Sequence, residues 1–421
     1  MNKLNFLQLV SINVYWVGLS FMWNSLHPII LPAVLLHLAP EKMKNTTLGV
    51  LSFAGLILAM IIQPISGAAS DTWRSRWGRR RPLALIGTSL DFIFLALLAL
   101  SGNLFVVIVG YIGLQIASNV AHGPMQGLIP DQVPDEQLGT ASGVKNLMDM
   151  GGLIAASLAA GSLLSPDDRY PTTIMLAVMA VLALSAAVTF LTAREQPTSD
   201  LRKTVNRLSF REIFKIDLAG NRNYFRLIGS RFVFLIGIYG VQTFAQYFIR
   251  DVMRAENPIQ ATGDLMAALA VALVLCSLIG GWLSDRIGAR RVVLLATVIA
   301  AAGSFLLIFA ADLASMTLYA GVLGAGIGFY LTSNWALASR LAPKAEAGKF
   351  LGLTNLATAG ASALSRLGGI PIDLANNANP GRFMGYYGLF FFGGVFALLS
   401  LLLLYRVEEK READQDLITR M

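Results

Sequence analysis

Charged residues inside apolar segments are the first candidates for chemistry in this sequence. Lys145 and Asp149 lie four residues apart in the segment 139–163, a spacing that places both side chains on one face of a helix. A carboxylate beside a cation can exchange a proton, because burial and a neighbouring charge both shift its pKa. The pair is either a proton-coupling element or a static ion pair that holds its helix to a partner, and we keep both interpretations.

Three further ionisable residues lie in apolar segments. His27 and His122 can each carry a proton near neutral pH or hydrogen-bond a hydroxyl group, and a packed histidine without such a role is the alternative. We expect Asp91 to have a structural partner, either Lys145 or a loop arginine, with proton coupling as the second interpretation. Ionisable groups are costly in hydrocarbon, so each of these residues is a functional candidate.

Neutral polar and aromatic side chains in the same segments suit a ligand that is rich in hydroxyl groups. Amides present donors and acceptors together, and indole rings can stack on a sugar face, although tryptophans more often serve packing. Arg366 can bind an anionic group, or pair with Asp373 or a carbonyl. The substrate-binding candidates are Trp23, Asn24, Asn119, Gln126, Tyr239, Gln242, Gln246, Asn334, Trp335 and Arg366.

The segments that carry these residues are predicted to span a membrane. The chain has 421 residues, of which 55% are hydrophobic and 14% charged, against about 25% charged in a soluble domain. Its apolar runs are long enough to cross a hydrocarbon core of about 30 Å, where a helix satisfies its own backbone hydrogen bonds. The twelve predicted spans are 11–37, 48–70, 83–101, 104–129, 139–163, 171–192, 226–250, 261–283, 292–311, 315–340, 349–373 and 382–406.

The distribution of basic residues indicates the orientation. With a cytoplasmic N-terminus, the inner loops and tails hold 24 of the 33 lysines and arginines, the outer loops hold six, and three lie within spans. Positive charge concentrates on the cytoplasmic side of membrane proteins, so we expect both termini there. The formal net charge of +8 is therefore explained by the basic loops on the cytoplasmic side of the membrane, and we expect no nucleic-acid partner.

The chain divides around a polar, basic segment. We expect a six-helix bundle at 1–192, a cytoplasmic linker at 193–225, a second six-helix bundle at 226–406 and a cytoplasmic tail at 407–421. Within the linker, LSFREIFKID is predicted to form a short amphipathic helix on the inner leaflet. The predicted fold class is an all-α membrane protein with twelve transmembrane helices in two pseudo-symmetric six-helix bundles.

An internal repeat relates the two halves. The loop GAASDTWRSRWGRRR follows the second span and GWLSDRIGARR follows the eighth, with Asp71 and Asp285 in corresponding positions. PDEQLGTASGVKNL, beginning at Pro134, aligns with PKAEAGKFLGLTNL, beginning at Pro343. Two helical halves that share loop signatures are typical of a duplicated transporter fold.

These loops resemble the signature of the major facilitator superfamily, and the resemblance covers nearly the whole chain. The signature is a glycine, three residues, an aspartate, a basic residue, a glycine and paired basic residues, and GWLSDRIGARR matches it in full. The resemblance implies that each loop is a conformational latch in which the aspartate pairs with arginines. The latch residues are Gly67, Asp71, Gly78, Arg79, Arg80 and Arg81 in the first loop, and Gly281, Asp285, Arg286, Gly288, Arg290 and Arg291 in the second.

The longer first loop is similar to that of plant sucrose–proton symporters and their animal relatives, S-D-R-x-x-S-R-F-G-R-R-R-P. Thr72 and Trp77 replace the first Arg and the Phe of that pattern, and the segments 31–38 and 122–131 also resemble this branch. In one departure, Gln126 stands where the branch has an arginine. The fifth span also lacks the Gly-Pro kink that is common in drug–proton antiporters.

The resemblance implies a secondary active transporter that works by alternating access, with spans 1, 4, 7 and 10 lining a central cavity. The similarity to sucrose–proton symporters implies proton-coupled symport of a sugar or glycoside. One alternative is export of a hydrophobic or amphipathic compound. Another is a non-transporting membrane assembly factor that uses the same fold, which a cavity closed by packed apolar side chains would favour.

The expected partners are a small-molecule substrate, protons and the lipid bilayer. We expect no enzyme activity, because no nucleophile–base arrangement is evident, and no ATP drive, because the pattern G-x-x-x-x-G-K-[ST] is absent. Three histidines and Cys276 show no metal-ligand spacing, so we expect no metal and no other cofactor. We expect a monomer, as is usual in the superfamily, in the plasma or inner membrane.

Overall fold

The protein is described by a computed structural model that covers residues 3–168, 170–193, 195, 220–343 and 347–407. Every regular element in these residues is a helix, which confirms the predicted all-α membrane fold. Ten described helical segments are long and apolar enough to span a membrane. The predicted linker helix at 208–217 lies outside the described residues.

The helices follow the predicted spans closely in the first half of the chain. Its elements are α1 (Phe6–Asn13), α2 (Tyr15–Ser25), η1 (Leu26–Ile30), α3 (Leu31–Leu38), η2 (Glu41–Met43), α4 (Lys44–Thr72), α5 (Arg81–Ala99), α6 (Leu104–Gln132), η3 (Asp135–Gln137), α7 (Leu138–Leu163) and α8 (Thr172–Thr192). The predicted fifth span corresponds to α7, whose Lys145 and Asp149 make it more polar than its neighbours.

The described helices of the second half begin at Arg222. They are α10 (Arg222–Asp251), α11 (Pro258–Ile287), α12 (Ala289–Leu306), η4 (Leu307–Phe309), α13 (Leu313–Leu341), α14 (Ala347–Arg366), α15 (Gly369–Ala378) and α16 (Met384–Leu404). The predicted eleventh span is interrupted at residues 367–368, so that α14 and α15 are separate helices.

The chain forms two compact units. Unit 1 comprises Met1–Asn206, Gln242–Ala270 and Arg366–Tyr386, and unit 2 comprises Arg207–Val241, Val271–Ser365 and Tyr387–Met421. Unit 1 thus contains the described first half of the chain together with α15, the end of α10 and the beginning of α11.

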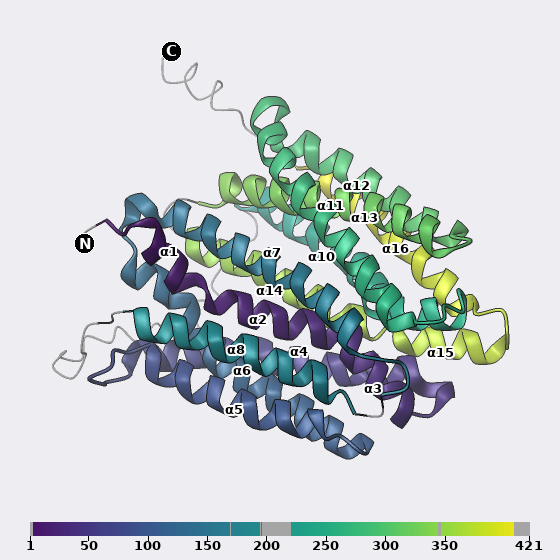
Figure 1. The fold of residues 1–421 in the computed structure, drawn as a ribbon. Coiled ribbons are helices and arrows are strands. Elements are labelled where there is room, and N and C mark those ends of the chain that lie inside the picture. Colours follow the sequence, from purple (N-terminus) through teal and green to yellow (C-terminus); the bar gives the residue numbers. More distant parts are fainter. Residues whose placement is uncertain (1–2, 169, 194, 196–219, 344–346, 408–421) are drawn as a thin grey trace, which may run out of the picture. The chain divides into compact units, whose positions relative to one another are not determined.

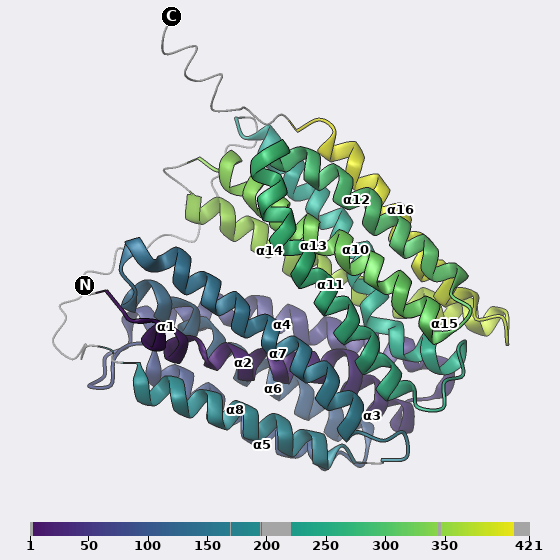
Figure 2. The same cartoon turned by 45° about the horizontal axis from the view of Figure 1, so that its top comes forward.

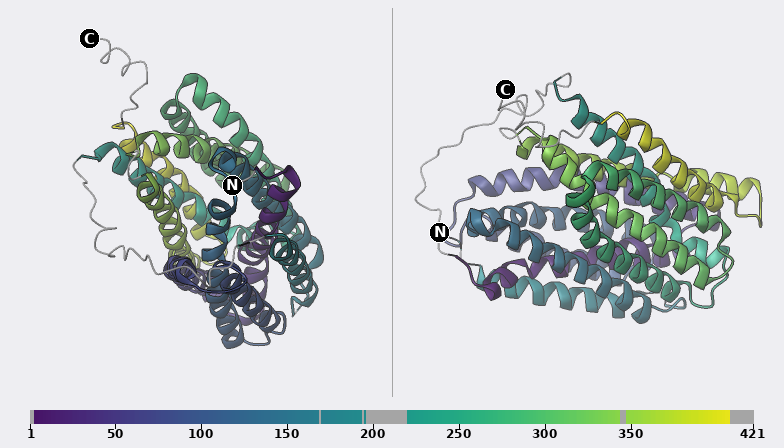
Figure 3. Two further views of the ribbon diagram at one scale, coloured as in Figure 1. Left: turned by 90° about the vertical axis from the view of Figure 1, so that its left-hand side faces the viewer. Right: turned by 90° about the horizontal axis from the view of Figure 1, so that it is seen from above.

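Within unit 1, long helices run side by side. α2 packs against α7 and α8, and α6 packs against α4 and α5 (Figures 1 and 2). α5 packs along α6, and the right-hand view of Figure 3 again shows helices of the first half of the chain running side by side. Buried tyrosines fill this interior: Tyr15 on α2 and Tyr111 on α6 have no exposed surface.

Within unit 2, α12 packs along α13. Phe234 of α10 stacks on Tyr330 of α13, with ring centroids 3.7 Å apart. Ser304 Oγ of α12 donates to the carbonyl oxygen of Phe390 in α16 at 2.8 Å. These contacts hold four helices of the second half together.

The two repeated loops share a backbone feature. Gly78 and Gly288 both have φ of 95°, in the left-handed region where a side chain is unfavourable. Each glycine stands just before the helix that follows its loop, α5 or α12. The repeat seen in the sequence is therefore also present in the backbone.

Candidate functional site

A π-helical turn shapes the region around His27. α2 passes through η1, which contains His27 and Pro28, before α3 begins. Short π-helical insertions are frequent at functional sites. Gln246 of α10 faces this turn, and in the amide orientation that satisfies both groups its nitrogen donates to the carbonyls of Ile29 at 2.9 Å and Pro28 at 3.2 Å. This predicted substrate-binding residue thus supports the backbone that positions His27.

The residues Trp23, His27, Tyr111, Gln115 and Asn119 form what we call the His27 cluster. Trp23 stacks on His27 with ring centroids 4.8 Å apart. His27 Nε2 lies 3.0 Å from the Tyr111 hydroxyl, and Gln115 Nε2 donates to that hydroxyl at 2.8 Å. Asn119 Nδ2 donates to the backbone oxygen of Gln115 at 2.8 Å. The cluster combines amides, a hydroxyl and stacked rings from α2, η1 and α6.

A second group on α2, α6 and α7 comprises Trp16, His122, Gln126, Lys145 and Asp149, and we call it the Lys145 cluster. Lys145 Nζ lies 2.8 Å from Asp149 Oδ2 and 4.0 Å from the centroid of the Trp16 ring. Trp16 meets His122 edge to face at 5.1 Å, and His122 Nε2 lies 3.2 Å from Gln126 Nε2. The cation is therefore held by a carboxylate and an aromatic face, a combination that stabilises an ammonium group.

The Lys145–Asp149 pair is only partly shielded. About a quarter of each side chain is exposed, 26% for Lys145 and 28% for Asp149. Ser20 Oγ of α2 donates to the backbone oxygen of Asp149 at 2.6 Å, and Asn24 Nδ2 donates to the Ser20 backbone oxygen at 2.8 Å. A partly exposed ion pair fixed on one helix can exchange its internal partner for a proton or a ligand.

The environment of Asp91 differs from the prediction. Asp91 of α5 has no exposed surface, and neither carboxylate oxygen accepts a hydrogen bond from any described residue. The expected partner Lys145 instead pairs with Asp149, and the paired loop arginines contact other groups. The expectation of a partner among Lys145 or the loop arginines is wrong, because Asp91 is buried beside Tyr15 and neither of its oxygens has a hydrogen-bond partner among the described residues.

The remaining substrate-binding candidates lie in the second half of the chain. Arg366 Nη1 donates to Thr243 Oγ1, and its charge lies within electrostatic range of His27 and Tyr111. Gln242 and Tyr239 are half-buried on α10. On α13, Asn334 is fully buried, whereas Trp335 is 40% exposed.

The first repeated loop closes around Arg80. Its Nη1 lies 2.5 Å from Asp71 Oδ1, and its Nε lies 2.8 Å from Asp131 Oδ2 at the end of α6. Arg79 also pairs with Asp131, which raises the pKa of the Arg79 guanidinium above its ordinary value. The backbone nitrogens of Arg80 and Arg81 donate to the Glu195 carboxylate at 2.8 and 2.9 Å. The predicted pairing of Asp71 with a loop arginine is thus present.

The loop packs tightly where its glycines lie. A Cβ atom built on Gly78 would fall 2.3 Å from the Glu195 side chain, whereas one on Gly67 would make only ordinary contact, with its nearest neighbour at 3.7 Å. The Gly78 position therefore needs glycine both for its positive φ and for space.

The second repeated loop is more open. Asp285 meets Arg340 at 3.4 Å, and their side chains are 78% and 46% exposed. Arg286 lies over the Trp282 ring at 4.1 Å, and Arg290 Nη2 donates to the backbone oxygen of Tyr405 at 2.7 Å. The two loops share a sequence signature but differ in burial.

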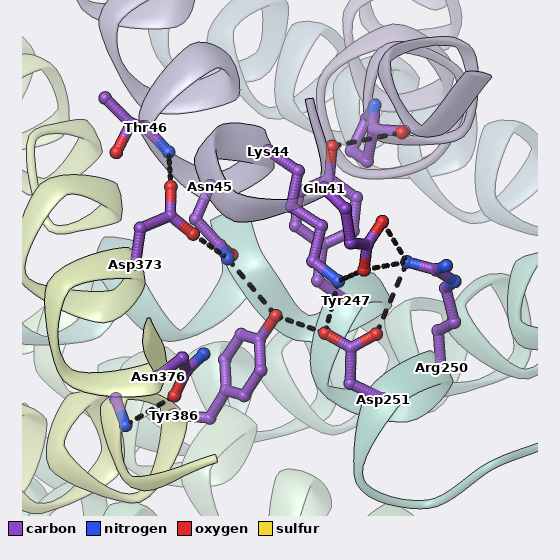
Figure 4. Close-up of polar contacts among 12 residues, drawn as sticks. Glu41, Lys44, Asn45, Thr46, Tyr247, Arg250, Asp251, Asp373, Asn376 and Tyr386 are labelled. Atoms are coloured by element: carbon purple, nitrogen blue, oxygen red, sulfur yellow. Dashed lines mark hydrogen bonds and ion pairs between the residues drawn. The ribbon is translucent and has the colours of Figure 1, made fainter. Parts of the chain in front are cut away.

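A polar network that the sequence analysis missed lies at the end of unit 1 where α4 begins. It comprises Glu41, Lys44, Asn45, Thr46, Arg250, Asp251, Asp373 and Tyr386, and we call it the Lys44 network (Figure 4). Lys44 Nζ lies 2.6 Å from both Glu41 Oε1 and Asp251 Oδ2. The Tyr386 hydroxyl donates to Asp251 Oδ2 at 2.7 Å, and Arg250 Nη1 lies 3.0 Å from Glu41 Oε1.

The other half of the Lys44 network connects α4 to α15. Asn45 Nδ2 donates to Asp373 Oδ1 at 2.8 Å, and the Thr46 backbone nitrogen donates to Asp373 Oδ2 at 2.6 Å. Figure 4 shows Asp373 and Asp251 on opposite sides of Asn45 and Tyr386. At Gly369 a Cβ atom would fall 2.0 Å from the Asn45 backbone oxygen. Without a side chain at Gly369, the two helices can approach this closely.

These observations define a helical membrane protein with polar clusters between its spans, and comparison with known proteins identifies the family. Residues 4–366 and 257–420 match the Major Facilitator Superfamily, and the chain belongs to that superfamily. It is accordingly an alternating-access membrane transporter, and its family and structural relatives are transporters, not enzymes.

Individual relatives differ in what they carry. The chain is 23% identical over 420 residues to the multi-drug resistance efflux pump PmrA of Streptococcus pneumoniae, covering 95% of this chain and 98% of that protein. It is 28% identical over 129 residues to the sucrose transport protein SUC3 of Arabidopsis thaliana, covering 25% of this chain and 22% of that protein.

Solved structures show the same fold. A bacterial homologue of the human lysosomal transporter Spinster, in an inward-facing and occupied conformation, has a TM-score of 0.76 at 14% identity and covers 96% of both chains. A D-xylose–proton symporter has a TM-score of 0.73 at 16% identity, covering 96% of this chain and 98% of the symporter.

Proposed function

We propose that this transporter couples proton movement to the uptake of a sugar or glycoside. The observation that carries the proposal is the partly exposed Lys145–Asp149 pair near the middle of α7. A carboxylate in that position can take up a proton and release its lysine, since partner charge and burial both act on its pKa. Protonation and deprotonation of Asp149 would then be linked to the conformation of α7.

The His27 cluster supports a hydroxyl-rich ligand. Gln115 and Asn119 carry amide groups and Tyr111 carries a hydroxyl, which are buried and bonded within the cluster. A ligand would exchange some of these bonds for its own. The stacked rings of Trp23 and His27 are only half-buried. Amide and hydroxyl groups match the alternating donors and acceptors of a sugar. The local similarity to a plant sucrose transport protein and the resemblance of the first loop to that branch favour the same substrate class.

The proposal includes an orientation and a location. The excess of lysine and arginine in the loops assigned to the inner side favours cytoplasmic termini. With that orientation, the Lys44 network faces the outside and the Arg80 loop faces the cytoplasm. We place the protein as a monomer in the plasma or inner membrane.

Uptake into proteoliposomes tests this function. Labelled sucrose and maltose are supplied outside vesicles that contain the purified protein, with and without an inward proton gradient. Accumulation that requires the gradient and collapses with a protonophore is the expected result. Uptake of neither sugar under any gradient contradicts the substrate class, and uptake indifferent to the protonophore contradicts the proton coupling.

Export of amphipathic compounds is the second candidate. The similarity to a multi-drug efflux pump over almost the full length of both proteins favours it. Ethidium efflux from cells that express the protein, compared with cells that express the Asp149→Asn variant, provides the test. Asp149-dependent efflux without sugar uptake would replace the first proposal with this one.

A further inference from the structure

Arg231 is a buried cation in the second half of the chain. It lies on α10, nine residues after the helix begins, roughly 13 Å along its axis, and is only 6% exposed. Its Nε donates to Thr358 Oγ1 at 2.8 Å, and its Nη1 donates to Asn334 Oδ1 at 2.8 Å. Both acceptors are neutral, so these hydrogen bonds position the guanidinium without neutralising it.

No described carboxylate of unit 2 balances this charge. In that part of the chain the carboxylates are those of Asp285 and Asp312. Asp285 is largely exposed and meets Arg340. Asp312 caps the N-terminal end of α13. Along the helix axis, that position lies roughly 33 Å from Asn334. An uncompensated charge within a membrane-spanning helix is costly, and such charges mark ligand and ion pathways.

The surroundings of Arg231 leave donors available. A guanidinium carries five N–H groups, and Nη2 donates to no residue that the structure describes. Asn334 is fully buried, and its Nδ2 lies 3.4 Å from the Tyr330 hydroxyl. Tyr330 is held in place by its stacking on Phe234. A rigid donor fork among neutral polar groups fits the planar, bidentate geometry of a carboxylate.

We infer that Arg231, held by Asn334 and Thr358, is a binding site for the carboxylate of a transported monoanion. A single cation with neutral neighbours matches one negative charge. A dianionic phosphate would leave charge uncompensated. This inference rests on the proposed transport of a sugar or glycoside, and it makes that ligand an acidic one, such as a sugar in which the terminal carbon is a carboxylate.

Binding of glucuronate and glucose to the purified transporter in detergent tests the inference. The two sugars differ chiefly in one carboxylate, so their affinity ratio isolates the contribution of the charge. We expect the wild-type protein to bind glucuronate at least about tenfold more tightly than glucose. In the Arg231→Gln variant the two affinities should become equal, and in Arg231→Lys part of the preference should remain.

A second variant tests the same charge without removing the arginine. Asn334→Asp places a carboxylate where Oδ1 now accepts from Nη1, and thus supplies an internal counter-ion. We expect it to abolish the preference for glucuronate and to raise the thermal stability of the unliganded protein. The matched control is Arg226→Gln, five residues earlier on α10, where the arginine donates to the backbone oxygen of Arg406. This variant should leave the glucuronate preference unchanged.

Each outcome separates the two proposals. If glucose and glucuronate bind equally to the wild type, the sugar proposal stands and the carboxylate site is overturned. If neither sugar binds but benzoate binds and loses affinity in Arg231→Gln, the site stands and the sugar proposal fails. If no carboxylate binds in an Arg231-dependent manner and Arg231→Gln only lowers the melting temperature, the carboxylate site is overturned. Arg231 then has a structural role in holding α10, α13 and α14 together.

Discussion

Lys44 Nζ lies 2.6 Å from Asp251 Oδ2, with only 6% and 8% of the two side chains exposed. The residues are far apart in the sequence, and their contact joins the beginning of α4 to the end of α10. Breaking a buried ion pair from one side leaves the other charge unpaired, which is much more costly than losing an exposed pair. The Lys44 network is therefore a strong connection between the two halves of the chain.

A double-mutant cycle on this pair is the first prediction. Lys44→Met should lower the free energy of unfolding by about 3 kcal/mol, and the Lys44→Met/Asp251→Leu double variant should recover most of that loss. Denaturant unfolding in detergent micelles measures both values. Lys42→Met, at an exposed position two residues earlier, is the control and should change stability by less than about 0.5 kcal/mol. Strictly additive losses would show that the two charges do not interact.

Asp149→Asn should separate binding from coupling. The amide keeps the shape of the side chain but cannot be protonated, so accumulation driven by a proton gradient should fall to the background level. Exchange of labelled for unlabelled sugar across the membrane needs no net proton movement and should continue. Counterflow and gradient-driven uptake in the same proteoliposomes give the two rates. The control is Asp167→Asn, which removes an exposed carboxylate in the loop after α7. Equal losses in both assays would indicate a structural role for Asp149.

The helical architecture could be predicted because a membrane leaves the backbone little choice. Apolar runs of sufficient length must be helices, and the repeated loop signature correctly indicated equivalent turns at Gly78 and Gly288, which share φ of 95°. Interruptions inside spans were missed. Neither the π-helical turn at Leu26–Ile30 nor the break between α14 and α15 changes the mean hydropathy of its segment.

Local pairs were predictable, whereas distant ones were not. Lys145 and Asp149 are one helical turn apart, so helix geometry alone brings them together. Lys44 and Asp251 belong to different halves, and only tertiary packing selects them as partners. Arg231 is one of the three basic residues that lie within predicted spans, and its position in the sequence alone assigns it no role. A signal for a role of Arg231 is nevertheless present in the sequence: almost no acidic residue occurs in the spans of the second half, so few carboxylates there could neutralise its charge.

The two repeated loops should differ in their contribution to stability. Arg80 is buried and bonded to Asp71, Asp131 and Ser70, so Arg80→Ala should lower the free energy of unfolding by about 1–3 kcal/mol. In the second loop, Asp285 corresponds to Asp71, and its exposed pair with Arg340 of α13 should contribute about 0–1 kcal/mol. Unfolding of Arg80→Ala and Arg340→Ala under identical conditions compares them. Equal effects would mean that burial does not distinguish the two loops.

The first turn of α13 should open at low pH, because a charged cap holds it. Asp312 Oδ1 accepts from the Ser315 backbone nitrogen at 2.7 Å and from the Ser315 hydroxyl at 2.8 Å. These bonds, the backbone one first, lower the pKa of Asp312 below its ordinary value. A carboxylate whose pKa is lower in the folded state stabilises that state at pH values above the unfolded pKa of about 3.9. The contribution is lost as the pH falls through the pKa of Asp312 in the folded state.

Hydrogen exchange at Leu313–Met316, corrected for intrinsic rates, should therefore accelerate below about pH 4. Asp312→Asn keeps a good capping side chain without the charge, so its exchange should show no such acceleration. If the acceleration persists in that variant, another group controls the opening of α13.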